Sequence, residues 1–285
     1  MVSHFRYHAS VVAAVLRLPA LEILDRFFSW QYRALRARGF SYDYFPIEFE
    51  TWRDAAQVHL SDASAKPIAD FYNGLIRHHQ DFIGLSEQPQ HLVLALAADW
   101  SEVREAFMMG LITGDYRECR RITQTSLSGG GKVLDFVEQV VEPCLYGIGD
   151  LWERDEISVA QEHLASGIVL WVLASVFSPM PKPEPLGKIV LTAAPEELHE
   201  IGLHIIADLL TEAGWDVDFL GANTPADDLV QHAVKVQADV VGLSIGIAPS
   251  LHLAQRAIEQ LKREPKLRDV KIMVGGYLLR QYPQL

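Results

Sequence analysis

The chain has 285 residues, of which 49% are hydrophobic and 22% charged, a balance typical of soluble globular proteins with about two domains. A formal net charge of −12 argues against direct binding of nucleic acid, which needs a basic surface to neutralise phosphates. Cys119 and Cys144 lack paired spacing and predict neither a disulfide nor a thiolate metal site. Without a basic and apolar leader or an apolar run of bilayer length, the protein is expected to be cytoplasmic and to have no membrane contact.

Residues 1–92 carry helical periodicity and are expected to form an N-terminal helical domain. The clearest helix begins after Pro19, where apolar residues recur at helical spacing from Leu21 to Leu35, and it should end at Gly39. No recognition helix with basic residues is visible in this segment. The segment is instead dense in aromatic residues: Phe27, Phe28, Trp30, Tyr32, Tyr42, Tyr44, Phe45, Phe49, Trp52, Phe71, Tyr72 and Phe82.

Residues 93–180 are expected to form a four-helix bundle, because helical segments are separated at Gly114 and by the run from Ser128 to Gly131. The glycine run lacks a preceding strand and the spacing of a phosphate loop, so we interpret it as a turn between helices. A Pro-rich hinge, residues 179–185, follows the bundle.

Residues 186–285 alternate between strand-like and helix-like runs. This alternation predicts a doubly wound parallel sheet, Rossmann-like or flavodoxin-like, with at least four strands. Strand-like runs occupy residues 188–193, 239–243 and 270–274. Ligands of such sheets lie beyond the carboxyl ends of the strands, so the loops after these runs are the candidate site.

The loop after the first run carries the motif E-x-H-x-x-G, formed by Glu197, His199 and Gly202. A histidine in this place points its imidazole at the ligand crevice, and a neutral imidazole is a common metal ligand. Taken alone, such a short motif also arises by chance, and most loop histidines are solvated. The loops after the other two runs carry small residues at the same edge: Ser244, Gly246, Gly275 and Gly276.

Together these residues resemble the cobalamin-binding domains of the methionine-synthase type. The resemblance implies that His199 is the lower axial ligand of cobalt, since the corrin already supplies the equatorial nitrogens. Glu197 replaces the usual aspartate and would accept a hydrogen bond from the other ring nitrogen. The serine and the paired glycines would line the slot for the displaced nucleotide tail, where glycine allows close backbone approach. Gly246 stands where the family usually has leucine.

Residues 145–164 resemble the helix-bundle signature of cobalamin photoreceptors, with Trp152 followed by Glu162 and His163. The resemblance implies that the bundle lies over the upper face of adenosylcobalamin, where Trp152 caps the adenosyl group and Glu162 and His163 contact it. Glu153 stands where the carotenoid-gene repressors of this family have a histidine able to ligate cobalt after illumination. A bis-histidine light product through this position is therefore not expected. Singly, such a tryptophan is more often a core residue, and a Glu-His pair a polar first turn.

The combined patterns predict a light sensor that binds adenosylcobalamin and needs no turnover. Light would break the cobalt–carbon bond, and loss of the adenosyl group would alter a homo-oligomer or a partner contact. The main alternative is a corrinoid shuttle protein for methyl transfer, which is an enzyme component built on the same two domains. A haem or redox sensor on this scaffold is a third alternative.

The architecture also resembles the photocobilins, a subgroup of cobalamin photoreceptors that pairs the corrin with biliverdin. The N-terminal aromatic residues could form stacking walls for a bilin, and Arg33, Arg36 and Arg38 could bind its two propionates. Neither cysteine lies in this segment, so such a bilin would be held without a covalent bond. A plain helical core with a solvated basic face is the simpler interpretation.

Overall fold

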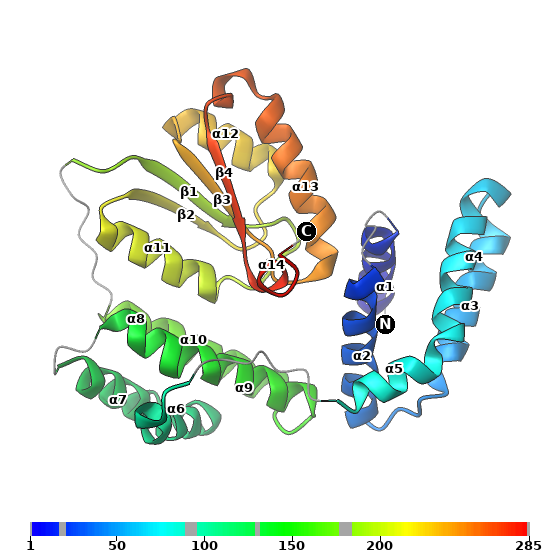
Figure 1. Ribbon diagram of the computed structural model, residues 1–285, viewed down its shortest axis with the longest axis horizontal. Helices are drawn as coiled ribbons and strands as arrows, with labels where there is room; N and C mark the ends of the chain where they lie inside the picture. Colours follow the sequence, from blue (N-terminus) through cyan, green and yellow to red (C-terminus); the bar gives the residue numbers. More distant parts are fainter. Residues whose placement is uncertain (1, 17–20, 89–95, 129–131, 177–183, 284–285) are drawn as a thin grey trace. The chain divides into compact units, whose positions relative to one another are not determined.

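The structure is a computed structural model that describes residues 2–16, 21–88, 96–128, 132–176 and 184–283 (Figure 1). It divides into two compact units, one made of residues 1–21 and 177–285 and the other of residues 22–176. The domain limits expected from the sequence, 1–92, 93–180 and 186–285, stay predictions. The predicted turn at residues 129–131 and most of the Pro-rich hinge lie outside the described residues.

The first unit is built on a parallel sheet of four strands in the order β2-β1-β3-β4. The strands are β1 (Lys188–Ala193), β2 (Asp216–Gly221), β3 (Val240–Ser244) and β4 (Lys271–Gly275). β1 is central and buried from its second residue onward, as expected of an apolar strand covered on both faces. The doubly wound parallel sheet is therefore confirmed, with flavodoxin-like order, and its strand order reverses between β1 and β3.

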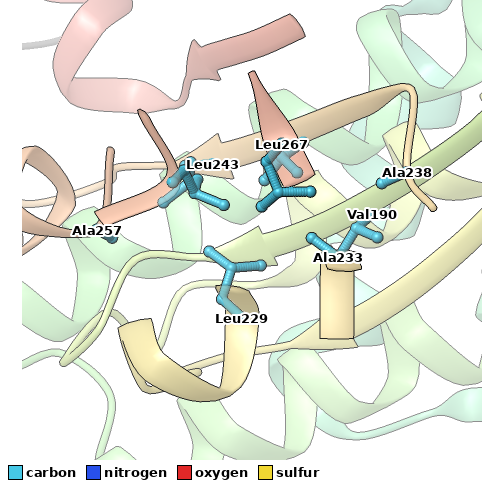
Figure 2. Packing of buried hydrophobic residues seen from close by; sticks show 9 residues of the cluster. Val190, Leu229, Ala233, Ala238, Leu243, Ala257 and Leu267 are labelled. Carbon is cyan, nitrogen blue, oxygen red and sulfur yellow. The ribbon is translucent and has the colours of Figure 1, made fainter. Parts of the chain in front are cut away.

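Helices cover both faces of this sheet (Figure 1). On one face, α11 (Ile201–Ala213) packs Leu203 and Ala207 against β1. Figure 2 shows the other face, where α12 (Ala226–Val236) and α13 (Ala248–Arg263) enclose buried apolar residues: Val190, Leu229, Ala233, Leu243 and Ala257. Neighbouring residues of β1 point to opposite faces, so one short strand serves both cores. The other elements of this unit are α1 (Val2–Val15), which packs on α13, η3 (Pro265–Leu267) and α14 (Tyr277–Gln281).

The second unit begins with the helices α2 (Leu21–Ala37), α3 (Tyr44–His59), α4 (Asp62–Arg77) and α5 (His79–Ser86). α2 buries Ile23, Leu24, Phe28 and Tyr32 at helical spacing. The chain leaves this helix through Gly39, whose φ of 86° suits glycine. The predicted helix after Pro19 and its end near Gly39 are confirmed.

The rest of this unit is a bundle formed by α6 (Ser101–Thr113), α7 (Tyr116–Ser128), the continuous run α8 (Val133–Phe136), η2 (Val137–Val141) and α9 (Glu142–Glu153), and α10 (Val159–Val176). A short 3-10 turn, η1 (Ala98–Trp100), leads into it. The π-helical turn η2 precedes Pro143, which has no N–H for the carbonyl of Gln139. Arg104 Nη1 donates to that carbonyl instead, at 3.0 Å.

α10 corrects one expectation from the sequence. By length and composition it is apolar enough to cross a membrane, whereas no such run was expected. One face of α10 packs inside the bundle through Ala165, Ile168, Val169, Val172 and Leu173. The core helix of a soluble bundle passes the same test, so this property by itself is weak support for a membrane span.

Candidate functional site

The loop between β1 and α11 carries His199 at the carboxyl edge of the sheet. Neighbouring loops fix its backbone on both sides. The N–H of Ala194 donates to the carbonyl of Ser244 at 2.9 Å, and the N–H of Asn223 donates to the carbonyl of Glu197 at 3.0 Å. Because the strand order reverses between β1 and β3, this loop lies at the point where open α/β sheets form a ligand crevice.

Glu197 is fully buried, and its carboxylate joins two loops. Oε1 lies 2.5 Å from Nδ1 of His199 and accepts the backbone N–H of the same residue at 3.1 Å. Oε2 accepts the N–H groups of Gly246 and Ile247, at 2.7 and 2.9 Å, and the hydroxyl of Ser250 at 3.0 Å. A buried carboxylate needs such donors, and here they also fix where the imidazole stands.

The charge of Glu197 sets the protonation of its neighbour. Burial raises the pKa of the Glu197 carboxyl, but hydrogen bonds and charge from His199, with a further bond from Gly246, outweigh it and hold the pKa below its ordinary value. The carboxylate is therefore ionised at neutral pH and favours a proton on Nδ1 of His199. The imidazole is 72% exposed, so a metal can approach its Nε2 atom.

Gly246 and Glu197, the two positions that differ from the expected cobalamin-binding motif, lie next to each other. A Cβ atom placed on Gly246 would lie 3.1 to 3.4 Å from the Glu197 carboxylate, which is tighter than ordinary contact. The longer arm of a glutamate reaches into the space that a side chain at position 246 needs. A glutamate at position 197 is therefore compatible with glycine at position 246, and would be crowded by a larger residue there.

Ser250 was not predicted from the sequence. It is fully buried in the first turn of α13, donates to Glu197 and lies 2.9 Å from the carbonyl of Ile247. In the sequence, the only signal for this role is that Ser250 directly follows Pro249 in the turn after β3. Its role becomes clear only in the structure, where the loop after β3 contacts the loop that carries Glu197.

The other residues expected at this edge of the sheet differ in whether the backbone itself requires a glycine. Gly276 has a φ of 108°, and a Cβ on it would lie 2.4 Å from the Ile245 carbonyl oxygen, so this position needs glycine for the backbone itself. A Cβ on Gly275 or Gly202 would meet no other atom of the described residues within 4 Å, which leaves open space beside both. Ser244 ends β3 and is half-buried.

The residues expected above the cobalt belong to the second unit. Trp152 lies in the last turn of α9, Glu162 lies in the first turn of α10, and His163 follows it. Glu162 accepts the hydroxyl of Ser166 at 2.8 Å, and its side chain is 30% exposed against 74% for His163. Glu197, His199 and Gly246 are thus in contact within one unit, whereas Trp152, Glu162 and His163 belong to the other unit, where Glu162 lies beside His163 and Trp152 contacts Trp30 and Arg38.

Glu153 has a partner that explains its presence next to Trp152. Its side chain is 11% exposed and forms an ion pair with Arg33 Nη1 of α2 at 2.5 Å. A histidine at this position would leave a partly buried guanidinium without its carboxylate.

The N-terminal aromatic residues mostly pack against one another. The rings of Tyr32 and Phe45 stack with centroids 3.5 Å apart, and Phe28 contacts Phe49 and Phe82 edge-on or tilted. These packed rings favour the core interpretation over stacking walls for a bilin. The three arginines also have contacts of their own, since Arg33 and Arg38 bond to α9 and Arg36 lies over Tyr42.

Among the described residues no group of three or more His, Cys, Asp or Glu side chains could hold a bare metal ion. A cobalt that arrives inside a corrin needs only one protein ligand below it. Cys119 and Cys144 are free and buried, and burial raises the pKa of each thiol to about 12. The two cysteines form no disulfide with each other, as expected from their spacing.

Comparison with protein families gives two matches. Residues 187–285 match a model described as a B12 binding domain, and residues 103–174 match a second model with the same description. The first match contains the His199 loop and the second contains Trp152, Glu162 and His163.

Two kinds of relative resemble this chain. The HTH-type transcriptional repressor CarH of Myxococcus xanthus is 34% identical over 148 residues, which are 51% of this chain and 48% of the repressor. Dimethylamine corrinoid protein 2 of Methanosarcina acetivorans is 28% identical over 145 residues, which are 50% of this chain and 67% of that protein. This chain therefore spans about half the length of CarH.

A solved structure also shares the fold. The monomethylamine corrinoid protein of Methanosarcina barkeri matches with a TM-score of 0.54 and 20% identity, over 62% of this chain and 85% of that one. Taken together, the fold and the matched segments define a helical bundle followed by a Rossmann-like B12-binding domain. The matches support cobalamin binding and favour a corrin over a haem.

Proposed function

We propose that this protein is a light sensor that binds adenosylcobalamin and is not an enzyme. The observation that carries the proposal is the placement of Trp152 in the last turn of α9 and of Glu162 and His163 near the start of α10. This cap sequence lies in a segment that matches a B12 binding domain and in a chain whose His199 is already oriented by a buried carboxylate.

On the lower face, His199 ligates cobalt through Nε2 while Glu197 holds Nδ1. The displaced nucleotide tail would lie beside Gly202 and Gly275, where a Cβ atom would meet nothing within 4 Å, with Ser244 at the end of β3. Gly246 contributes through its backbone, whose N–H is taken by Glu197, and Gly276 keeps the β4 loop close to β3.

By the resemblance to cobalamin photoreceptors, Trp152 would cap the adenosyl group, and Glu162 and His163 would contact it. Adenosylcobalamin, when bound, supplies a cobalt–carbon bond that visible light breaks. Loss of the adenosyl group removes the contacts of these three side chains, which biases the bundle toward a second arrangement. A change of homo-oligomer or of a partner contact would carry the signal. Glu153, paired with Arg33, does not provide a second imidazole for the light product.

Reconstitution in the dark tests the proposal. We expect adenosylcobalamin to bind base-off with a histidine-ligated spectrum, green light to convert the spectrum irreversibly, and size-exclusion chromatography to show different elution in dark and light. A protein whose dark spectrum and elution are unaffected by green light would not be this sensor.

The second candidate is a corrinoid carrier for methyl transfer. It is supported by the dimethylamine corrinoid protein, two-thirds of which this chain matches. A carrier has no use for an adenosyl-sized pocket below Trp152, so it should bind methylcobalamin at least as tightly as adenosylcobalamin. The ratio of the two dissociation constants separates the candidates.

Biliverdin as a second chromophore, a cytoplasmic location and the absence of direct DNA contact stay predictions. The acidic net charge of −12 supports the last of these.

A further inference from the structure

The side chain of Arg38, the residue directly after α2, reaches the end of α9. Arg38 Nη2 donates to the carbonyl of Trp152 at 3.0 Å, and Nη1 donates to the carbonyl of Glu153 at 3.2 Å. The carbonyls in the last turn of a helix carry partial negative charge, which a cation stabilises. Arg38 thus holds the turn that presents Trp152.

The indole ring of Trp152 is itself held by Trp30 of α2 and by Arg38 just after that helix. Its centroid lies 6.3 Å from that of Trp30, with the two planes 27° apart, and Arg38 Cζ lies 4.8 Å above it. Stacked aromatic pairs and cation–π contacts of this geometry each favour one ring position. The cap tryptophan is therefore positioned by residues far from it in sequence.

A third contact extends the connection to α5. Arg33 pairs with Glu153, and its other nitrogens donate to the carbonyls of Ser86 at 2.8 Å and Gln88 at 3.2 Å. The side chains of Arg33 and Glu153 are 23% and 11% exposed, so solvent screens this pair less than an open surface pair. α9, α2 and the end of α5 are joined at one guanidinium.

We propose that α2 is a positioning element for Trp152 and couples the adenosyl side of the cobalamin site to the N-terminal helices. The inference rests on the proposed function in taking Trp152 as the adenosyl cap. A movement of Trp152 on loss of the adenosyl group is transmitted through Trp30, Arg38 and Arg33. Because coupling between two sites is reciprocal, a change in α2 alters the preference for adenosylcobalamin in return.

The first measurement uses protein without cobalamin. Arg38→Gln should speed amide hydrogen exchange in the last turn of α9, since two of its carbonyls lose their guanidinium. Arg53→Gln is the matched control, because that guanidinium contacts Asp54 and Asn73 within the N-terminal helices. Equal exchange at α9 in Arg38→Gln and in the control would overturn the inference without reference to any cofactor.

The second measurement compares dissociation constants of adenosylcobalamin and methylcobalamin in the dark. Arg38→Gln and Trp30→Ala should each lower the adenosyl preference roughly fivefold, the low end of typical coupling between sites. Arg38→Lys, which keeps the charge and loses the fork, should fall between, and it serves if the glutamine variant does not fold. Equal weakening of both cobalamins would show a merely structural role and would contradict the inference.

A double-mutant cycle separates the two proposals. If Arg38 acts through Trp152, Arg38→Gln should have no further effect on the ratio in the Trp152→Ala background. An undiminished effect there would refute coupling through this ring. Failure of wild-type protein to prefer adenosylcobalamin would count against the proposed function, whereas a wild-type preference that Arg38→Gln leaves intact counts against this inference alone.

Discussion

The two sets of residues predicted to contact cobalamin, one in each unit, are held in different ways. In the first unit, Glu197 has no exposed surface and accepts five hydrogen bonds, from His199 Nδ1 and N, Gly246 N, Ile247 N and Ser250 Oγ. In the second unit, Trp152 lies at a helix end and is held by the side chains of Trp30 and Arg38, and His163 is 74% exposed. The first set is held by a buried carboxylate and backbone N–H groups, and the second by contacts between side chains of distant segments.

The largest effect is expected at the lower ligand. His199→Ala should abolish the histidine-ligated spectrum and weaken cobalamin binding strongly, because the only protein bond to cobalt is lost. Titration followed by absorbance measures both quantities. His204→Ala is a matched control, since His204 stacks on Phe219 with centroids 5.0 Å apart. An unchanged spectrum and affinity in His199→Ala would contradict the proposal that His199 ligates cobalt.

Glu197→Gln is expected to have the next largest effect. An amide NH2 facing either carboxylate oxygen position would oppose the N–H donors of the loop, so stability should fall by about 1–3 kcal/mol. Cobalamin affinity should fall roughly 10- to 100-fold, as when a partner of a metal-ligating histidine is lost. Thermal unfolding and cobalamin titration measure the two effects. Ser250→Ala removes one donor and should cost less than Glu197→Gln; the reverse order would contradict the central place of the carboxylate.

Gly246→Leu tests whether the two departures from the family pattern compensate each other. The new side chain crowds the Glu197 carboxylate and should destabilise the fold by about 1–3 kcal/mol, as overpacking does. Adding Glu197→Asp shortens the arm and should recover part of this loss, which a double-mutant cycle on the free energy of unfolding detects. Purely additive effects would show that the two positions are independent.

Trp152→Ala tests the predicted role of Trp152 as the cap of the adenosyl group. It should reduce binding of adenosylcobalamin several-fold with little effect on methylcobalamin, since the lost aromatic face contacts only the larger group. The histidine-ligated spectrum should persist, because His199 is held by Glu197 rather than by α9. A wild-type protein without adenosyl preference would instead favour the methyl carrier.

The smallest effect is expected when biliverdin is titrated into the protein and the absorbance is followed. A bilin pocket predicts a red-absorbing complex on titration of the cobalamin-loaded protein, which dissociates on denaturation and weakens when Arg33 or Arg36 is changed to Gln. The packed rings around Phe28 and Tyr32 favour a small response. No absorbance change at saturating bilin would leave cobalamin as the only chromophore.

The sequence predicted the surroundings of the first set of residues better than those of the second. A buried apolar strand followed by Glu197, His199 and a helix is local information, and the order of alternating strands places that loop at the switch point. The roles of the cap residues Trp152, Glu162 and His163 came from a resemblance to cobalamin photoreceptors and stay a prediction. The partners that hold Trp152 were not predicted, because Trp30 and Arg38 meet Trp152 only after folding brings distant helices together.

Two further features lay beyond sequence reasoning for similar reasons. The contact of Ser250 with Glu197 depends on how two loops approach each other across the sheet edge. The π-helical turn at Val137–Val141 depends on Pro143 and on the chance that Arg104 can satisfy the carbonyl of Gln139. Neither periodicity nor composition encodes such contacts.

The identity of the lower ligand tests the account most directly. Protein labelled with 15N at histidine and loaded with cobalamin can be reduced to the cobalt(II) state and measured by electron paramagnetic resonance. If His199 ligates cobalt, the axial nitrogen splitting should change from triplets in unlabelled protein to doublets in labelled protein. Triplets that persist after labelling would show the nucleotide base of cobalamin still on cobalt, and would contradict the role of His199.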